Sequence, residues 1–174
     1  MILDGERIRQ LGLVEGFVLN EQFQPAGVDL TAQSLWAYDG EGVIDADNKK
    51  RKIPAAKKLE WGADGSVRLW PGAYKIIFNE TVSIPKDCAA FARSRSSLLR
   101  MGASVQTALW DPGYTGRSEA LLYVFNPAGI VVHANARLVQ LVFARLERAA
   151  GAGYCGQYQG ENLGGKEGDR LEKG

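Results

Sequence analysis

From Ala26 onward, short apolar runs alternate with the turn-forming residues Gly, Pro, Asn and Asp. Runs of this size, bounded by such residues, are typical of the strands of barrels and sandwiches. The runs are VDLTA (28–32), VRLW (67–70), YKIIFNETVSI (74–84), AAFARS (89–94), ALLYVFN (120–126), IVVHA (130–134) and RLVQLVFARL (137–146). The pattern therefore predicts a mainly β domain built as a barrel or sandwich.

The segment before these runs predicts a short N-terminal helix. Asp4 is a good helix-capping residue, Ile8 and Leu11 are spaced as on one helix face, and Gly12 marks the end. The pattern therefore predicts a short helix that begins after Asp4 and ends near Gly12.

Two further segments depart from the β-pattern. Residues 39–66 are polar and charged, and we expect them to form an inserted hairpin or long loop. Residues 151–174 contain eight glycines and show no apolar periodicity, which indicates a flexible tail or lid. We therefore divide the chain into a β domain over residues 1–153 and a C-terminal lid over residues 154–174.

Length and charge narrow the class of partner. The 174 residues fit one domain that can bury a core without disulfides. A net charge of +1 and a pI near 7.7 give no extended basic field, and KKRK (49–52) has acidic neighbours, so we expect a small ligand and not nucleic acid. No segment has 18 continuous apolar residues, so we expect a cytoplasmic protein that neither enters a membrane nor is exported.

Two familiar sites are excluded by residue type. Cys88 and Cys155 are far apart, and His133 is the single histidine, so a zinc site of the Cys-x-x-Cys type cannot form. The stretch GENLGGKE (160–167) approaches a phosphate-loop pattern, but Glu167 stands where Ser or Thr is needed. We reject both sites.

Candidate chemistry concentrates in RSRSSLLRMG (93–102) and DPGYTG (111–116). Arginine forks and serine hydroxyls together suit a chain of phosphates. Asp111 precedes Pro112 and Gly113, so its carboxylate projects from a tight turn and is a candidate base for activating water. An ordinary turn-capping aspartate is the alternative.

Four motifs, in order and on predicted strands, carry a resemblance. They are AGVDLTA (26–32), RSSLLRMG (95–102), DPGYTG (111–116) and ARLVQLVF (136–143), with LWPGAYKIIFNETVSIP (69–85) leading into the second. Together they resemble the dUTPase and dCTP deaminase superfamily over nearly the whole chain. The tail YCGQYQGEN (154–162) and the insertion are most similar to archaeal-type dUTPases.

The resemblance implies a distorted jelly-roll of the β-clip type, assembled as a homotrimer with active sites shared between subunits. It implies hydrolysis of dUTP to dUMP and pyrophosphate. Asp111 matches the aspartate that activates water, Tyr114 matches the tyrosine that supports the deoxyribose, and Gln106, Thr107 and Ala108 occupy the segment that reads the pyrimidine through backbone groups.

The same resemblance assigns the phosphates to the second and fourth motifs. Arg95, Ser96, Ser97 and Arg100 match the groups at the phosphates and base pocket. Gln140, a polar residue in an otherwise apolar run, matches a phosphate-contacting glutamine, although a structural hydrogen bond explains it nearly as well.

Metal and lid assignments also come from the resemblance. Asp29 matches an aspartate that organises the site and the waters around Mg²⁺, an ion held mainly by the triphosphate and not by a cage of protein ligands. Tyr154, Tyr158 and Gln159 match a lid that closes over the phosphates. A disordered terminus is the alternative.

A dCTP deaminase, alone or combined with diphosphatase activity, is the second candidate function. The metal-free deaminases of the superfamily use a glutamate on the strand after the Asp-Pro-Gly turn, but the matching positions here are Leu121 or, in another register, Tyr123. Glu119 shares strand parity with both, so it stays as a candidate catalytic residue. A silent binding protein on the same scaffold is the third candidate.

Overall fold

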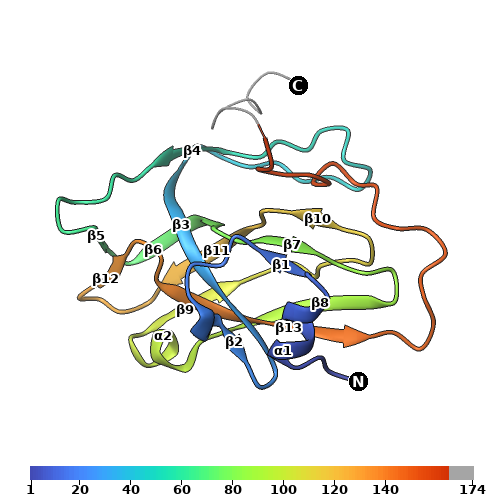
Figure 1. Cartoon of the computed structure of the whole chain (residues 1–174). Coiled ribbons are helices and arrows are strands. Elements are labelled where there is room, and N and C mark those ends of the chain that lie inside the picture. Colours follow the sequence, from blue (N-terminus) through green and yellow to red (C-terminus); the bar gives the residue numbers. More distant parts are fainter. Residues whose placement is uncertain (165–174) are drawn as a thin grey trace.

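The computed structural model describes residues 1–164 (Figure 1), and they form the mainly β fold that the apolar pattern predicted. Helices are short: α1 (Gly5–Gln10), α2 (Ser96–Arg100) and the 3₁₀ turn η1 (Asn20–Gln22). The strands are β1 (Val14–Glu15), β2 (Phe23–Gln24), β3 (Gly27–Asp39), β4 (Ala55–Lys58), β5 (Ser66–Leu69), β6 (Gly72–Phe78), β7 (Thr81–Ser83), β8 (Cys88–Ser94), β9 (Ala103–Gln106), β10 (Thr115–Gly116), β11 (Glu119–Val124), β12 (Ile130–His133) and β13 (Arg137–Arg145).

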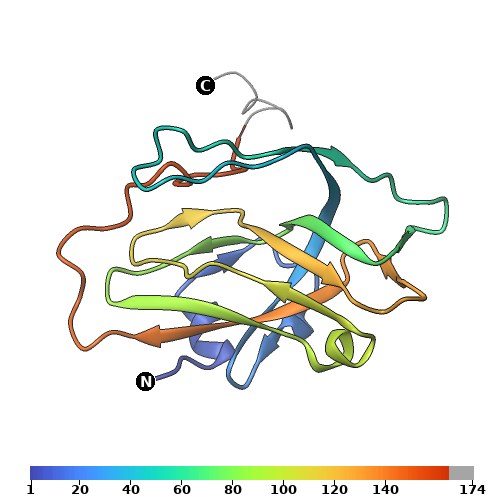
Figure 2. The ribbon, with the colours of Figure 1, turned by 180° about the vertical axis from the view of Figure 1, so that it is seen from behind.

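Most strands belong to one curled antiparallel sheet that nearly closes into a barrel (Figures 1 and 2). Its order is β8-β13-β3-β6-β11-β9, and β2 and β4 also pair with β3. The end strands β8 and β9 meet where the Ser94 hydroxyl accepts from the Val105 amide over 2.8 Å. Two small sheets, β1-β7-β10 and β12-β5, complete the distorted jelly-roll.

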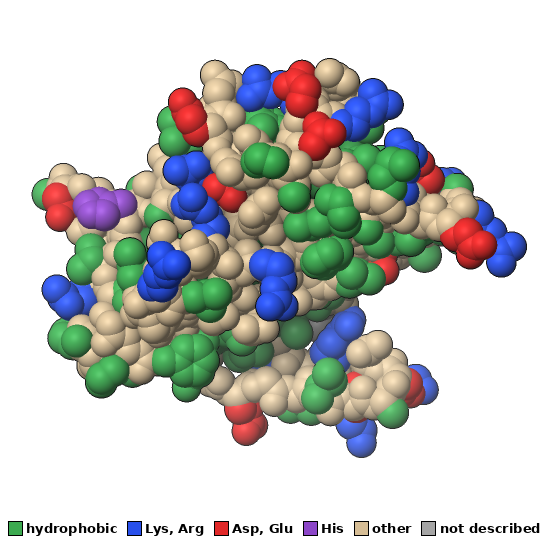
Figure 3. Space-filling view, turned by 90° about the horizontal axis from the view of Figure 1, so that it is seen from below, with side chains coloured by type: hydrophobic (Ala, Val, Ile, Leu, Met, Phe, Trp, Pro, Cys, Tyr) green, Lys and Arg blue, Asp and Glu red, His purple; other side chains and the backbone are tan. Residues whose placement is uncertain are grey.

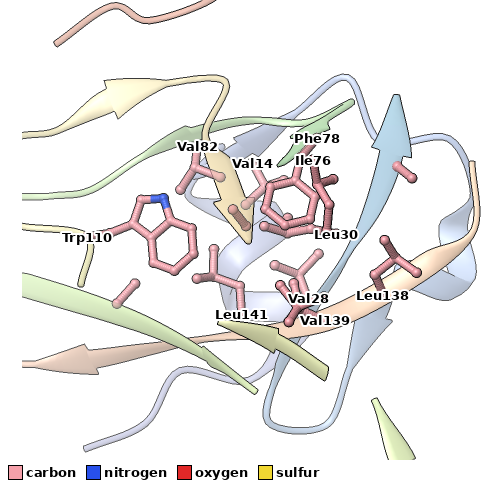
Figure 4. Close-up of a cluster of buried hydrophobic side chains, with 14 of the residues drawn as sticks. Val14, Val28, Leu30, Ile76, Phe78, Val82, Trp110, Leu138, Val139 and Leu141 are labelled. Atoms are coloured by element: carbon pink, nitrogen blue, oxygen red, sulfur yellow. The ribbon is translucent and has the colours of Figure 1, made fainter. Parts of the chain in front are cut away.

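The core lies inside this curled sheet. Along β13 the inward residues Val139, Leu141 and Phe143 are fully buried, while the residues between them are partly exposed. This alternation follows from the two-residue period of a strand with one face on the core. Figure 4 shows Val139 and Leu141 in one buried cluster with Phe78 and with Trp110, which lies immediately before Asp111.

The N-terminal helix is confirmed, including its start and its end. The Asp4 carboxylate accepts from the Arg7 amide over 2.9 Å, which caps the helix. Gly12, at φ +60°, takes the left-handed conformation that commonly terminates a helix.

The inserted segment forms a long excursion from the sheet. β3 continues to Asp39, β4 returns beside it from Ala55, and an isolated bridge joins Val43 to Lys52 between them. Figures 1 and 2 show this excursion lying beside the C-terminal segment, and the Arg51 guanidinium donates to the Gln157 side chain. The insertion and the tail, far apart in sequence, therefore meet.

The run predicted over 74–84 is divided into β6 and β7 by a turn that buries Glu80. The Glu80 carboxylate accepts from Gln22 Nε2 at 2.7 Å, from the Thr31 amide at 2.9 Å and from the Thr31 hydroxyl at 2.6 Å. Its side chain is fully buried, and burial raises the pKa of Glu80 despite these hydrogen bonds. This carboxylate links the η1 turn to β3, and its partner Gln22 also donates to the Asp29 carbonyl at 2.8 Å.

Glu80 makes folding stability depend on pH. Because its folded pKa is raised, the carboxyl stabilises the fold most at pH below 4.5, the usual pKa of glutamate, and this contribution is lost as pH rises through the folded value. We expect the unfolding free energy of wild type, minus that of Glu80→Gln, to fall between acid and neutral pH. Denaturant titrations of both proteins across this range measure it, and a constant difference would contradict the assignment.

Candidate active site

Asp111 stands at a corner that the backbone holds firmly. Trp110 pairs with Ala90 of β8, Gly113 takes a φ of +86° and its amide donates to the Ile84 carbonyl at 2.9 Å, and the Asp111 carbonyl accepts from the Tyr114 amide at 3.1 Å. The turn therefore closes through backbone groups and not through the Asp111 side chain. This carboxylate is exposed and takes part in no hydrogen bond or ion pair within residues 1–164.

Asp111 and Glu119 line the same cavity, whose volume is about 190 Å³. Residues from the turn, from β11 and from the C-terminal segment surround it. The lining consists of Ala108, Leu109, Trp110, Asp111, Tyr114, Ser118, Glu119, Tyr154, Tyr158 and Glu161. The structure thus brings together both predicted catalytic carboxylates, the predicted sugar-supporting tyrosine and two tyrosines of the predicted lid.

Glu119 is held by neighbours, unlike Asp111. Its Oε1 lies 3.3 Å from Lys75 Nζ on β6 and 3.4 Å from Asn162 Nδ2 in the C-terminal segment. On β11 it shares a face with Leu121 and Tyr123, as the strand parity predicted. Within the described residues, a cation and an amide therefore engage Glu119, whereas the Asp111 carboxylate has no such partner.

Tyr114 is fixed inside the cavity wall. It is 6% exposed, its hydroxyl lies 3.0 Å from Ser118 Oγ and donates to Glu161 Oε1 at 2.8 Å, and its ring meets Tyr154 edge-on with 5.8 Å between centroids. Burial raises the pKa of the Tyr114 hydroxyl far above its usual range. The phenol is therefore neutral and serves as a hydrogen-bond donor.

The C-terminal segment docks on the turn through backbone contacts. Gln159 accepts from the Thr115 amide at 3.0 Å and donates to the Gly113 carbonyl at 3.0 Å, and the Tyr154 amide donates to the Pro112 carbonyl at 2.7 Å. A Cβ on Gly113 would lie 2.8 Å from the Cα of Gly153. The turn motif needs glycine both for its φ and for this close approach.

A second hollow, of about 380 Å³, adjoins the first. Gln106, Thr107 and Ala108 line one side, and Arg93 and Ser94 of β8 line the other. The two hollows share Ala108 and Leu109, so residues 106–111 run from one directly into the other. This continuity suits a ligand whose parts are read in succession, such as a base and its sugar.

The predicted phosphate-binding arginine is anchored to a buried aspartate. Asp29 is 1% exposed, and its Oδ2 lies 3.1 Å from Arg95 Nε and 3.5 Å from Arg137 Nη1, as ion pairs outside hydrogen-bond geometry. Burial raises the pKa of the Asp29 carboxyl, and the charges of Arg95 and Arg137 oppose this. Asp29 thus holds two guanidinium groups at the end of β8.

The other residues predicted to bind phosphate lie next to Asp29 and Arg95, and together we call them the phosphate cluster. Gln140 of β13 lies directly opposite Asp29 on β3 and Arg93 on β8, so the three side chains share one face of the sheet. Ser96, Ser97 and Arg100 belong to α2, directly after Arg95, and all three are exposed.

One chain does not bring the phosphate cluster to Asp111. Trp110 pairs with Ala90, and Arg95 follows Ala90 by five residues along β8 and its end. At roughly 3.3 Å per residue, about 16 Å of extended backbone separates Ala90, beside Trp110, from Arg95. The predicted site residues therefore form two groups at opposite ends of β8.

The structure adds residues that sequence reasoning missed. Arg137 forms an ion pair with Asp29, and Lys75 forms one with Glu119. Glu161 accepts a hydrogen bond from the Tyr114 hydroxyl. Each of these interactions joins residues that are far apart in sequence, so local patterns could not reveal them. The one clue in the sequence was that Arg137 lies at the start of the motif ARLVQLVF (136–143). No three His, Cys, Asp or Glu side chains of residues 1–164 gather as a metal site.

The curled β-sheet carries two adjoining hollows at one candidate site, and comparison with known proteins gives the family of this fold. Residues 2–146 match the family model described as dCTP deaminase-like, and the chain belongs to this family. The sequence is similar to the probable deoxyuridine 5'-triphosphate nucleotidohydrolase of Methanosarcina mazei, at 50% identity over 86% of this chain and 88% of the relative. It is also similar to the deoxyuridine 5'-triphosphate nucleotidohydrolase of Methanocaldococcus jannaschii, at 42% identity over 80% of this chain and 88% of the relative.

A solved structure shows the same fold. The 2'-deoxycytidine 5'-triphosphate deaminase of Agrobacterium tumefaciens superposes with a TM-score of 0.62 at 25% identity. The match covers 82% of this chain but 46% of that one, so this chain spans less than half of its length. The predicted superfamily and its fold are thereby confirmed.

Proposed function

We propose that this protein is a dUTP diphosphatase that hydrolyses dUTP to dUMP and pyrophosphate. The observation that carries the proposal is that the unengaged Asp111 carboxylate lies in the cavity next to the second hollow, and that the lining of this second hollow contains no carboxylate. We call the second hollow, beside Gln106, Thr107 and Ala108, the base groove. The names of the archaeal relatives support the same reaction. The nucleotide lies along residues 106–111, with its base beside Gln106, Thr107 and Ala108 and its sugar against Tyr114.

Asp111 activates the attacking water in this proposal. The turn holds its backbone in place and its carboxylate is exposed in the cavity, so it can accept a proton as the water attacks phosphorus. The phosphorus–oxygen bond to the leaving pyrophosphate breaks as the new bond forms, which yields dUMP. Buried Tyr114, on the same turn, keeps the sugar at a fixed place beside this base.

The phosphates bind to Arg95, Ser96, Ser97, Arg100 and Gln140. Asp29 keeps the Arg95 guanidinium oriented, since a buried carboxylate favours a fixed cationic partner. Arginine forks balance the charge of the phosphates and leave the reacting phosphorus accessible.

Mg²⁺ fits this site as an ion carried by the triphosphate. The Asp29 carboxylate faces two guanidinium groups, which favours a role in holding Arg95 over direct contact with a metal. When bound, Mg²⁺ would neutralise phosphate charge. Asp29 would then affect the ion only indirectly, through waters or through Arg95.

A complete site needs a second copy of the chain. The phosphate cluster and Asp111 lie at opposite ends of β8, so neighbouring subunits of a homotrimer would supply them to one nucleotide. The docked segment with Tyr154, Tyr158 and Gln159 would cover the sugar side as a lid. Residues 165–174, the end of the predicted lid, lie outside the described residues.

Other partner classes have little support. Figure 3 shows basic, acidic and hydrophobic side chains interspersed over the face that it presents, a pattern that suits a small ligand better than nucleic acid. Within residues 1–164, the helices are all too short to cross a bilayer. A cytoplasmic location stays a prediction.

The deaminase alternative is favoured by the description of the matching family, by the deaminase of known structure with the same fold, and by Glu119, which lines the cavity with Asp111. Against it, Leu121 pairs with Gln106 and Tyr123 pairs with Ser104, so apolar and aromatic side chains adjoin the base groove where a catalytic glutamate is needed. Glu119 is also engaged by Lys75. Hydrolysis is therefore the better supported reaction.

Incubation with dUTP or dCTP and Mg²⁺, with pyrophosphate and ammonia measured separately, tests the proposal. We expect pyrophosphate release from dUTP and no ammonia release from dCTP, because the base groove offers no acid or base to the 4-amino group. Ammonia release at a rate comparable to pyrophosphate release would favour the deaminase. Release of neither product would favour the silent binding protein.

A further inference from the structure

A buried chain of hydrogen bonds connects the catalytic turn to the C-terminal segment. Trp110 Nε1 donates to Ser118 Oγ at 2.6 Å, Ser118 Oγ lies 3.0 Å from the Tyr114 hydroxyl, and that hydroxyl donates to Glu161 Oε1 at 2.8 Å. An indole N–H only donates and a carboxylate only accepts. All hydrogens therefore point toward Glu161, with Ser118 donating to Tyr114.

Glu161 occupies a defined place in this arrangement. Its side chain is 7% exposed, its carbonyl accepts from the Arg117 amide at 2.9 Å, and its amide donates to the Tyr158 carbonyl at 3.2 Å. A buried carboxylate is costly unless hydrogen bonds satisfy it, so the Tyr114 hydroxyl and Glu161 stabilise each other's position. Glu161 also lines the cavity that holds Asp111.

The backbone is closed tightly around the Tyr114–Glu161 pair. A Cβ on Gly116 would lie 2.5 Å from the Tyr114 hydroxyl oxygen and 3.2 Å from Glu161 Cγ. Any side chain at position 116 would push these two groups. Glycine at the end of the DPGYTG motif therefore preserves the contact between Tyr114 and Glu161.

We propose that Glu161 is a positioning residue that fixes the Tyr114 ring and thereby sets the preference for deoxyribose over ribose. This inference rests on the proposed function, in which the Tyr114 ring supports the sugar. Tyr154 restrains the ring edge-on, and Glu161 with Ser118 restrains its hydroxyl. A ring held at both places cannot retreat to admit a 2′-hydroxyl, whereas a ring that has lost Glu161 can.

The test compares kcat/KM for dUTP and for UTP in wild type, Glu161→Ala and Glu161→Gln. In Glu161→Ala the ratio of the two values should fall about tenfold or more, the equivalent of one hydrogen bond to a charged acceptor. Glu161→Gln should stay within about threefold of wild type, since its amide oxygen still accepts from Tyr114. Circular dichroism and melting curves establish that the barrel is folded in each variant.

Two alanine substitutions at glycine provide an independent probe and its matched control. Gly116→Ala should lower the same ratio by crowding the Tyr114 hydroxyl, while Gly151→Ala, whose Cβ would meet nothing within 4 Å, should leave it unchanged. Equal losses on dUTP and UTP in Glu161→Ala would overturn the inference, as would Glu161→Gln behaving like Glu161→Ala. A wild type that hydrolyses no dUTP would instead contradict the proposed function.

Discussion

Asp111→Asn should fold, bind dUTP and lose on the order of 10² to 10⁴ in turnover, the usual cost of deleting a general base. Asparagine keeps the size of the side chain, and the turn closes through backbone groups that the substitution leaves in place. Only the ability to accept a proton from water is removed. Turnover and nucleotide affinity, measured together with Mg²⁺ present, separate this loss from a loss of binding.

Glu119→Gln is the comparison for Asp111→Asn because both carboxylates line one cavity. Its turnover should fall less, since an amide oxygen still accepts from Asn162 and Lys75. Melting curves report any loss of the ion pair to Lys75. Near-normal turnover in Asp111→Asn together with collapse in Glu119→Gln would move the base to Glu119 and favour the deaminase-like mechanism.

Mixing two inactive variants should restore activity if neighbouring subunits share the site. Asp111→Asn removes the base, and Arg95→Gln removes the guanidinium charge that binds phosphate in the proposed site. In a random one-to-one mixture of trimers, about one quarter of the sites combine an intact Asp111 with an intact Arg95 from the neighbour. Turnover after joint refolding should therefore approach about one quarter of wild type, far above either variant alone.

The controls for mixing are each variant refolded alone and the two mixed without refolding. Light scattering should give about three times the chain mass of 18.9 kDa. A fully active species at the mass of one chain, or a refolded mixture no more active than its components, would show that one chain contains the whole site.

Strand positions and the turn were predictable because both depend on local sequence. The apolar alternation of residues 137–146 is the burial pattern of β13, and Asp-Pro-Gly forms the expected corner. β9 was missed because its four residues contain only two apolar positions, Ala103 and Val105, which are too few to define a period.

Contacts between distant segments were not predictable. The sequence shows that Asp29 is unusual in an apolar run, but not that it lies buried between Arg95 and Arg137. Likewise, the glycine-rich composition of the tail gave no sign that Glu161 is buried against Tyr114. Such pairings depend on how strands from different parts of the chain are ordered, which local patterns do not encode.

The central place of β3 determines when the chain can fold. β3 pairs with β2 and β4, which are near in sequence, and with β6 and β13, the latter more than a hundred residues away. Until β13 has left the ribosome, β3 and β8 both lack the strand that lies between them, and apolar edges stay open. Barrel closure therefore waits for β13 and has a high contact order, so folding is expected to be slow and most vulnerable to aggregation before β13 pairs.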